Sequence, residues 1–212
     1  MVFLGHYASY KRGRVLHRDL SVNNLMIDWD RGNERHIGIL SDWDLASLID
    51  ESNKVVPTHL KHRTGTVPFM SINLLSESPP PHRYFHDLES FFYILVWASV
   101  HFNIEEHRCE RPQNKFLRWN SADLEAVSDT KTSFIMNPDD YESSVKEEFR
   151  ELFNTWIDAL RIMFHDAYYS REKSVSKDVT RSATISGRLE KFITFESFMA
   201  AIGREPRYTY TF

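Results

Sequence analysis

Apolar residues recur every three or four positions through much of this chain, which is the period of an amphipathic helix. The clearest stripe predicts one long helix over residues 141–166; its members are Val145, Phe149, Leu152, Phe153, Trp156, Ile157, Leu160 and Phe164. A second helix is expected from Asp87 to about Phe102, and because it is apolar on most sides it should be buried. We therefore expect residues 86–169 to form a helical core.

One segment shows the pattern of paired strands. Residues 25–28 and 36–40 are short and largely apolar, and they flank a turn, Asp-Arg-Gly-Asn, at residues 30–33. Such a pattern predicts a β-hairpin, and we expect it to hold all the β structure of the chain. The sequence thus predicts a mainly α fold with a small β-hairpin.

The C-terminal part of the chain changes character. Residues 170–192 are rich in Ser, Thr, Lys and Arg and show no period, so we expect a solvated polar loop there. Phosphorylation of this loop is an alternative, but a plain linker is favoured. Residues 193–203 are expected to form a closing helix that Thr194 caps and Gly203 ends.

Composition favours one folded domain. The chain has 212 residues, 42% of them hydrophobic, which suffices for a core and argues against disorder. A net charge of −4 gives no electrostatic reason to bind nucleic acid or an anionic membrane, so we expect neither partner. Cys109 is the one cysteine, residues 1–14 lack the apolar core of a signal peptide, and residues 91–100 are too few to span a bilayer. We therefore expect an intracellular location, cytoplasmic or nuclear.

Two polar segments carry the candidate chemistry. The first is His-Arg-Asp-Leu-Ser-Val-Asn-Asn at residues 17–24, and the second is Ser-Asp-Trp-Asp-Leu-Ala at residues 41–46, directly after an apolar run. The expected hairpin would bring Asn24 and Asp42 to the same end of two paired strands. Amide and carboxylate oxygens are the ligands that Mg²⁺ prefers, so these two residues are a candidate metal site.

Together, the two segments resemble the catalytic loop and the metal-binding Asp of protein kinases. The resemblance implies that Asp19 orients the substrate hydroxyl and accepts its proton, and it places Arg18 in the same catalytic group. Asp42 and Asn24 would hold Mg²⁺ against the phosphates of ATP. His17 is expected to support the loop structurally.

Two later segments extend the resemblance. Arg-Thr-Gly-Thr-Val-Pro-Phe-Met at residues 63–70 resembles the end of a kinase activation loop, where Thr66 would hydrogen-bond toward the catalytic Asp and shape the substrate platform. His-Asp-Leu-Glu-Ser-Phe-Phe-Tyr at residues 86–93 resembles the start of the large central helix of a kinase C-lobe. There, the residue that matches Asp87 ties down the backbone of the catalytic loop.

As a set, these motifs are similar to those of the fungal-type protein kinase family. The resemblance implies a kinase-like C-terminal lobe over residues 1–212, with the catalytic loop and hairpin in residues 1–40 and the metal Asp and activation segment in residues 41–75. The Gly-rich loop, strand Lys and helix Glu of a kinase have no counterpart here, so we expect the N-lobe to be missing. The resemblance implies Ser/Thr kinase chemistry on a protein substrate with ATP and Mg²⁺. We expect the chain alone to be inactive, with an N-lobe as a further partner.

Departures from the kinase pattern leave other interpretations open. Asp44 replaces the usual Gly after the metal Asp and its aromatic neighbour, but the resembling family shares this Asp, so it does not by itself imply inactivity. Ser21 replaces a Lys that lies near the γ-phosphate. Asn73 replaces a Glu that pairs with a later Arg, which leaves the anchor of the activation segment open. The alternatives are a non-catalytic, pseudokinase-like binding module and, less favoured, a small-molecule phosphotransferase of the aminoglycoside or choline kinase type. Arg18 and the Gly-Thr at residues 65–66 favour a protein kinase over the phosphotransferase.

Overall fold

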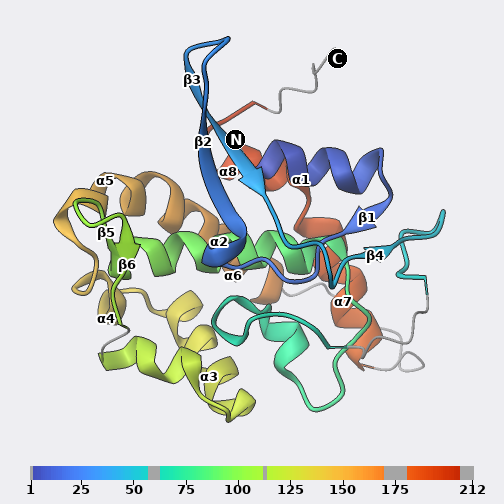
Figure 1. The fold of residues 1–212 in the computed structure, drawn as a ribbon. Coiled ribbons are helices and arrows are strands. Elements are labelled where there is room, and N and C mark those ends of the chain that lie inside the picture. Colours follow the sequence, from blue (N-terminus) through green and yellow to red (C-terminus); the bar gives the residue numbers. More distant parts are fainter. Residues whose placement is uncertain (1, 57–62, 112–113, 170–180, 206–212) are drawn as a thin grey trace.

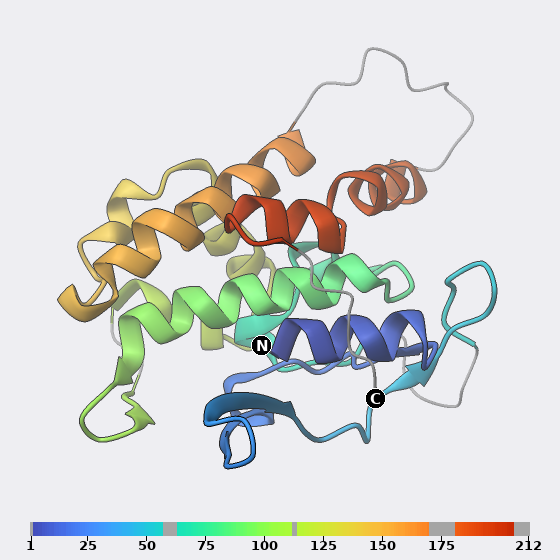
Figure 2. The same cartoon turned by 90° about the horizontal axis from the view of Figure 1, so that it is seen from above.

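The computed structural model describes residues 2–56, 63–111, 114–169 and 181–205, and this part of the chain is mostly helical. The long helix α2 (Tyr84–His101) runs through the middle of the molecule (Figure 1). Seen from above, α1 lies along one side of it, α6 along the other, and α8 between them (Figure 2). Most of α2 is buried, as predicted from the apolar residues on most of its sides, and the helix begins one turn before Asp87. The predicted mainly α fold is confirmed.

Shorter helices surround α2. They are α1 (Val2–Lys11), α3 (Leu124–Met136), α4 (Asp139–Glu142), α5 (Arg150–Leu152), α6 (Asp158–Tyr169), α7 (Arg181–Phe192) and α8 (Phe195–Ala201). Short 3₁₀ turns join them, namely η1 (Val22–Asn24), η2 (Val67–Phe69), η3 (Ile72–Leu75), η4 (Asn114–Asn120) and η5 (Glu147–Phe149). Helix α8 lies within the segment expected to form the closing helix, and the Thr194 hydroxyl caps it by accepting a bond from the backbone N–H of Ser197. None of the helices in the described ranges is both long and apolar enough to cross a membrane.

The helix expected over residues 141–166 is broken into several pieces. α4, η5 and α5 come first, then a π-helical stretch, η6 (Phe153–Ile157), and then α6. The apolar stripe still faces the core, because Ile157, Leu160 and Phe164 are fully buried. The period therefore predicted which face is buried, but it could not predict the wider turn that a π-helix introduces.

The β structure of the described residues consists of three two-stranded antiparallel ladders and one isolated bridge, between Ile49 and Val55. The ladders are β1 (Val15–Leu16) with β4 (Ser47–Leu48), β2 (Leu25–Asp30) with β3 (Arg35–Leu40), and β5 (Phe102–Asn103) with β6 (Arg108–Cys109). The predicted hairpin is β2–β3, with Leu25 opposite Leu40. The expectation that it holds all the β structure is wrong. Ladders two residues long contain no alternation of polar and apolar positions that a sequence pattern could reveal.

Helix α1 is wedged between the hairpin and the core. A Cβ atom at Gly38 of β3 would come within 2.4 Å of the Val2 side chain, so this close approach requires glycine. On the opposite side, the ring of Phe3 lies 4.7 Å from Phe91 of α2 and 5.4 Å from Phe198 of α8. The helix that leads into segment 17–24 is therefore fixed on several sides.

Residues 181–192 form α7, so the polar loop expected over residues 170–192 is wrong for this part; residues 170–180 lie outside the described residues. Leu189 is fully buried, and Ile185 packs against the core. These two residues and Phe192 recur at spacings of four and three, but polar residues between them hide so short a stripe. Contact with the core therefore determines this helix more than its own composition does.

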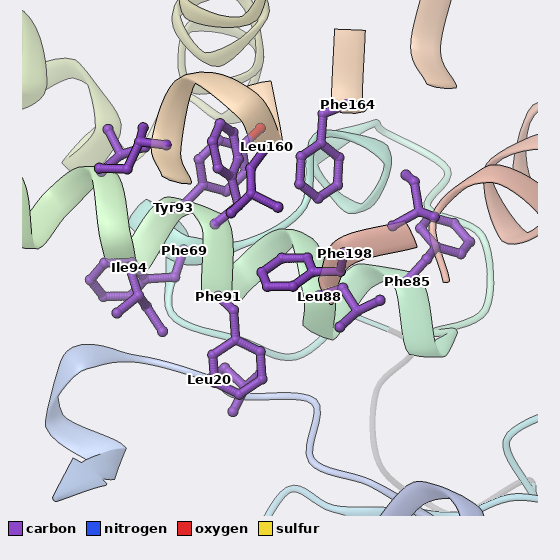
Figure 3. Packing of buried hydrophobic residues seen from close by; sticks show 14 of the residues in the cluster. Leu20, Phe69, Phe85, Leu88, Phe91, Tyr93, Ile94, Leu160, Phe164 and Phe198 are labelled. Carbon is purple, nitrogen blue, oxygen red and sulfur yellow. The ribbon is translucent and has the colours of Figure 1, made fainter. Parts of the chain in front are cut away.

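The core fixes segment 17–24 and the later segment 63–70 against one helix. Leu20 of segment 17–24 and Phe69 of η2 lie against α2 together with Phe164 of α6 and Phe198 of α8 (Figure 3). Each of these side chains is at most 4% exposed. Burial of a large apolar side chain contributes about 1.5–3 kcal/mol to stability. Leu20 and Phe69 therefore anchor the two loops that carry the candidate chemistry.

Candidate active site

A single buried carboxylate holds the backbone of segment 17–24. Asp87, 1% exposed, accepts a bond from the backbone N–H of His17 at 3.1 Å and one from that of Arg18 at 3.3 Å. Its oxygens also accept bonds from Nε2 of His6 at 2.9 Å and of His82 at 2.7 Å. Burial raises the pKa of Asp87, but the charge of His82 and the hydrogen bonds of both histidines outweigh burial and hold the pKa well below its usual range. The backbone contacts expected of Asp87 are present.

The ring of His17 joins the two polar segments. Its Nε2 donates to the carbonyl oxygen of Ser41 at 2.9 Å, and its Nδ1 accepts from the backbone N–H of Asp19 at 3.4 Å. The carbonyl can only accept, which assigns the ring proton to Nε2. The ring also lies 4.7 Å from that of Trp43. These contacts agree with the structural role expected of His17.

The carboxylate of Asp19 is positioned by segment 63–70, which the sequence predicts to be the end of an activation loop. The Thr66 hydroxyl donates to Oδ1 of Asp19 at 2.7 Å, and the Thr64 hydroxyl donates to the carbonyl oxygen of Arg18 at 3.3 Å. Between the two threonines, Gly65 has a φ of +126°, a conformation that other residues rarely adopt. The hydrogen bond that the sequence predicts from Thr66 to Asp19 is therefore present, while the catalytic role of either residue stays a prediction.

The hairpin brings Asn24 to the beginning of segment 41–46. The backbone N–H of Ser41 donates to the carbonyl oxygen of Asn24 at 3.0 Å. The side-chain amide of Asn24 donates to the carbonyl oxygen of Asp19 at 2.8 Å, which leaves the amide oxygen as the atom that could bind a cation. Asp42 is exposed, and its carboxylate has no hydrogen-bond partner within the described ranges.

These donors fit magnesium. An amide oxygen and a carboxylate are hard ligands, and Mg²⁺ is commonly held by one or two carboxylates together with phosphate and water oxygens. No group of three or more His, Cys, Asp or Glu residues suited to a metal occurs in the described part of the chain. Asn24 and Asp42 would therefore share a magnesium ion with a bound phosphate compound and would not form a complete protein cage.

Two site residues have a left-handed backbone. The φ angles of Arg18 and Asp42 are +70° and +61°, which non-glycine residues adopt at a cost of about 1–3 kcal/mol. Such strain persists only where the surroundings fix it. At Arg18 the surroundings include Asp87, which accepts its backbone N–H, and Ser47, whose hydroxyl accepts from the buried guanidinium. Burial lowers the pKa of Arg18, and Asp87 opposes this shift. The contacts of Arg18 are thus structural, and its catalytic assignment stays a prediction.

Sequence reasoning missed four buried polar residues next to these segments. They are His6, His82, Glu89 and Lys131, all of which are at most 3% exposed. Two of them carried a signal. Glu89 is the one acidic residue between Leu88 and Val100, and Lys131 lies in helical register with the buried Val127 and Phe134. A charge on an apolar stripe indicates a buried partner.

Comparison with known families agrees with this geometry. The family model described as fungal protein kinase matches residues 2–99. These residues contain α1, both polar segments, the hairpin, the described part of the activation segment and most of α2. A search of curated proteins gave no match to the chain. The predicted resemblance to the fungal-type protein kinase family is confirmed over residues 2–99.

Proposed function

Because residues 2–99 match the fungal protein kinase family, we propose that this chain supplies the catalytic loop, the magnesium ligands and the substrate platform of a Ser/Thr-type protein kinase. Its fold would be that of a kinase C-terminal lobe. The observation that carries the proposal is the 2.7 Å hydrogen bond from Thr66 to Asp19, which joins the activation segment to the catalytic loop. It supports the proposal because a substrate platform must lie beside the residue that receives the substrate proton.

Each residue has a role in this proposal. Thr66 binds one oxygen of Asp19 and fixes its orientation, so the second oxygen can accept the proton of a substrate hydroxyl. Asn24 and Asp42 hold the magnesium ion of Mg-ATP. That ion, when bound, neutralises charge on the phosphates during transfer. His17 and Asp87 keep the loop in place and do not touch the reacting atoms.

We propose that a second lobe completes the nucleotide site. Support comes from strand β2, where Met26, Ile27 and Trp29 are 47%, 79% and 48% exposed. Ile27 and Trp29 are two residues apart and therefore share one face of the strand, and exposed apolar side chains on one face are typical of a surface that another element covers. In a kinase, the second lobe also provides the Lys that contacts the α- and β-phosphates and the Gly-rich loop. ATP would therefore bind tightly only after the two lobes come together.

A non-catalytic binding module is the second candidate. Ser21 favours it, because a Ser at this position lacks the positive charge that most Ser/Thr kinases place near the γ-phosphate. Ser21 is also 3% exposed, so it is poorly placed to contact a substrate. In this case the activation segment would bind a protein without phosphorylating it.

Joining the chain to the N-lobe of a fungal-type kinase tests the proposal. The fusion protein should transfer labelled phosphate to a protein substrate, and Asp19→Ala should remove most of this activity. Asp166→Ala, which changes an exposed carboxylate of α6, is the control and should leave the activity unchanged. A loss of less than about tenfold on Asp19→Ala, or about 1.4 kcal/mol of barrier, would contradict the role of Asp19. The chain alone should show no transfer and only weak binding of Mg-ATP by calorimetry.

A further inference from the structure

Two charged side chains are fully buried on either side of the activation segment. Glu89 projects from α2 and Lys131 from α3, and both are 0% exposed. Charged residues are rarely buried so completely unless their polar atoms have partners, because removal of water from a charge is costly. Both residues have their partners in the same short stretch of chain, residues 67–72.

Glu89 binds the second half of this stretch. Its carboxylate accepts a bond from the Ser71 hydroxyl and one from the backbone N–H of Ile72 at 2.9 Å. The hydroxyls of Tyr93 and Tyr168 also donate to the Glu89 carboxylate, at 2.9 and 2.7 Å. A carboxylate has about four acceptor positions, so Glu89 is fully satisfied as a charged group.

Lys131 binds the first half. Its Nζ donates to the carbonyl oxygens of Val67, at 3.3 Å, and of Met70. The ammonium also lies 4.1 Å from the ring centre of Tyr93 and 5.5 Å from that of Trp119, which stabilises a cation without water. Burial lowers the pKa of Lys131, and Glu89 opposes this shift. The segment is thus held by a cation at its carbonyl groups and by an anion at its donors.

We propose that Glu89 and Lys131 are positioning residues that clamp residues 67–72 and thereby keep Thr66 against Asp19. This inference rests on the proposed function, because it assigns the anchor of the same substrate platform. The sequence leaves that anchor open, since Asn73 replaces the Glu that forms the usual ion pair. The side chain of Asn73 instead donates to the Ser186 hydroxyl on α7. Two buried charges from α2 and α3 therefore do what one ion pair does elsewhere.

Apolar contacts hold the same segment in addition to the two charged residues. Met70, Leu74 and Leu75 form a small buried cluster with Val127 of α3, and Phe69 reaches the core beside α2 (Figure 3). Thr66, which follows Gly65 and precedes the clamped residues, is itself exposed. Its position therefore depends on the rigidity of the residues that follow it.

Hydrogen exchange on the full chain tests the clamp without any assay of activity. In Glu89→Gln and Lys131→Met, amides within residues 63–75 should exchange at least about tenfold faster than in the parent protein, which corresponds to about 1.4 kcal/mol. Amides of α1 and α6 should exchange as before. Acceleration confined to residues 63–75 supports the clamp. No acceleration there, or an equal acceleration throughout the chain, overturns it.

Two further variants sharpen the experiment. Ser71→Ala removes one contact of Glu89 from the segment itself and leaves the buried charge in place, so it serves if Glu89→Gln does not fold. It should speed exchange in residues 63–75 alone. Ser99→Ala, which removes a buried hydroxyl bond on the same helix α2, is the matched control and should not change exchange in the segment. A faster segment in Ser99→Ala would overturn the assignment.

Kinetics of the fusion protein separate this inference from the proposed function. Ser71→Ala should raise KM for the protein substrate and leave KM for ATP unchanged, because the clamp acts on the platform and not on the nucleotide. Equal changes in both constants overturn the positioning role. If the parent fusion transfers no phosphate, the proposed function fails, and the exchange experiment still decides whether Glu89 and Lys131 hold the segment.

Discussion

The proposed catalytic loop at residues 17–24 and the proposed activation segment at residues 63–75 are held by the same helix in different ways. Asp87 accepts two backbone N–H bonds from the loop and two from histidine rings. Glu89 accepts one backbone N–H bond and three hydroxyl bonds. Because a helix turns about 100° per residue, carboxylates two positions apart point to nearly opposite sides. The partners of Asp87 therefore include two histidine rings, whereas those of Glu89 are three hydroxyl groups and one backbone amide.

Removal of the loop anchor should have the largest effect on stability. Asp87→Ala leaves two backbone N–H groups and two histidine rings buried without their acceptor, so the free energy of unfolding should fall by about 3–5 kcal/mol. Urea denaturation followed by fluorescence measures this loss. Asp166→Ala is the control, because that carboxylate is exposed and should matter by less than about 0.5 kcal/mol. A loss below about 1 kcal/mol for Asp87→Ala would show that the loop is held by other contacts.

Weakening the segment anchor should have a smaller effect on stability. Tyr168→Phe removes one of four donors to Glu89 and should cost about 1.5–3 kcal/mol, the range for hydrogen bonds to charged groups. Urea denaturation followed by fluorescence measures this cost. The neighbouring Tyr169 is partly exposed, so Tyr169→Phe is a matched control with little expected effect. A cost as large as that of Asp87→Ala would remove the contrast between the two anchors.

Acid should destabilise the protein through His86, which directly precedes Asp87 in α2. Burial, and then the charge of His82, hold the pKa of His86 well below its usual range, so the unfolded chain takes up a proton that the folded protein resists. The stability from a neutral His86 is present above about pH 6.5 and is lost as pH falls, by at most about 1.4 kcal/mol per unit. Asp87 adds no loss in this window, because its lowered pKa makes its stabilisation disappear only below about pH 4.

The variant His86→Gln isolates this effect. Nδ1 of His86 accepts the backbone N–H of Arg83 at the start of α2, and a Gln at this position can accept the same bond. Urea denaturation of both proteins at pH 7, 6 and 5 should therefore show that the free energy of unfolding depends less steeply on pH in the variant. Some pH dependence should persist, because burial also lowers the pKa of His101. Identical slopes would mean that His86 does not contribute.

The contact between the two regions should matter least for stability. Thr66 is exposed, so Thr66→Ala should change the free energy of unfolding by less than about 0.5 kcal/mol. In the fusion protein the same variant should lower phosphate transfer, since Asp19 loses the donor that orients it. Thr66→Ser retains the hydroxyl and should retain most activity. Full activity in Thr66→Ala would show that the bond between the two regions has no functional role.

The candidate site was predictable where it depends on local pattern. The turn between the strands fixes their register, and the register alone brings Asn24 next to Ser41, one residue before Asp42. The bond from Thr66 to Asp19 followed from a motif that the family shares. Each of these predictions needed only residues within a short motif or a hairpin.

The parts of the fold and of the site that the sequence did not predict depend on contacts between residues far apart in the sequence. Helix α1 has no single apolar face, because the hairpin, α2 and α8 surround it, so no stripe indicated it. Helix α7 needs the core to cover Leu189. The contacts of Glu89 and Lys131 join α2 and α3 to a loop that lies between them in space. The spacing of apolar residues along the sequence contains no information on contacts between such distant segments.

The contacts of Asp87 also determine when the loop can take its shape. His6 lies 81 residues, and His17 70 residues, before the carboxylate that binds them. During synthesis, segment 17–24 therefore emerges long before its anchor and cannot adopt its final backbone, including the left-handed turn at Arg18, until α2 has formed. Closure of so long a loop is slow compared with the formation of a hairpin or a helix. The part of this protein that would carry out chemistry is made before the helix that anchors it, and is completed late.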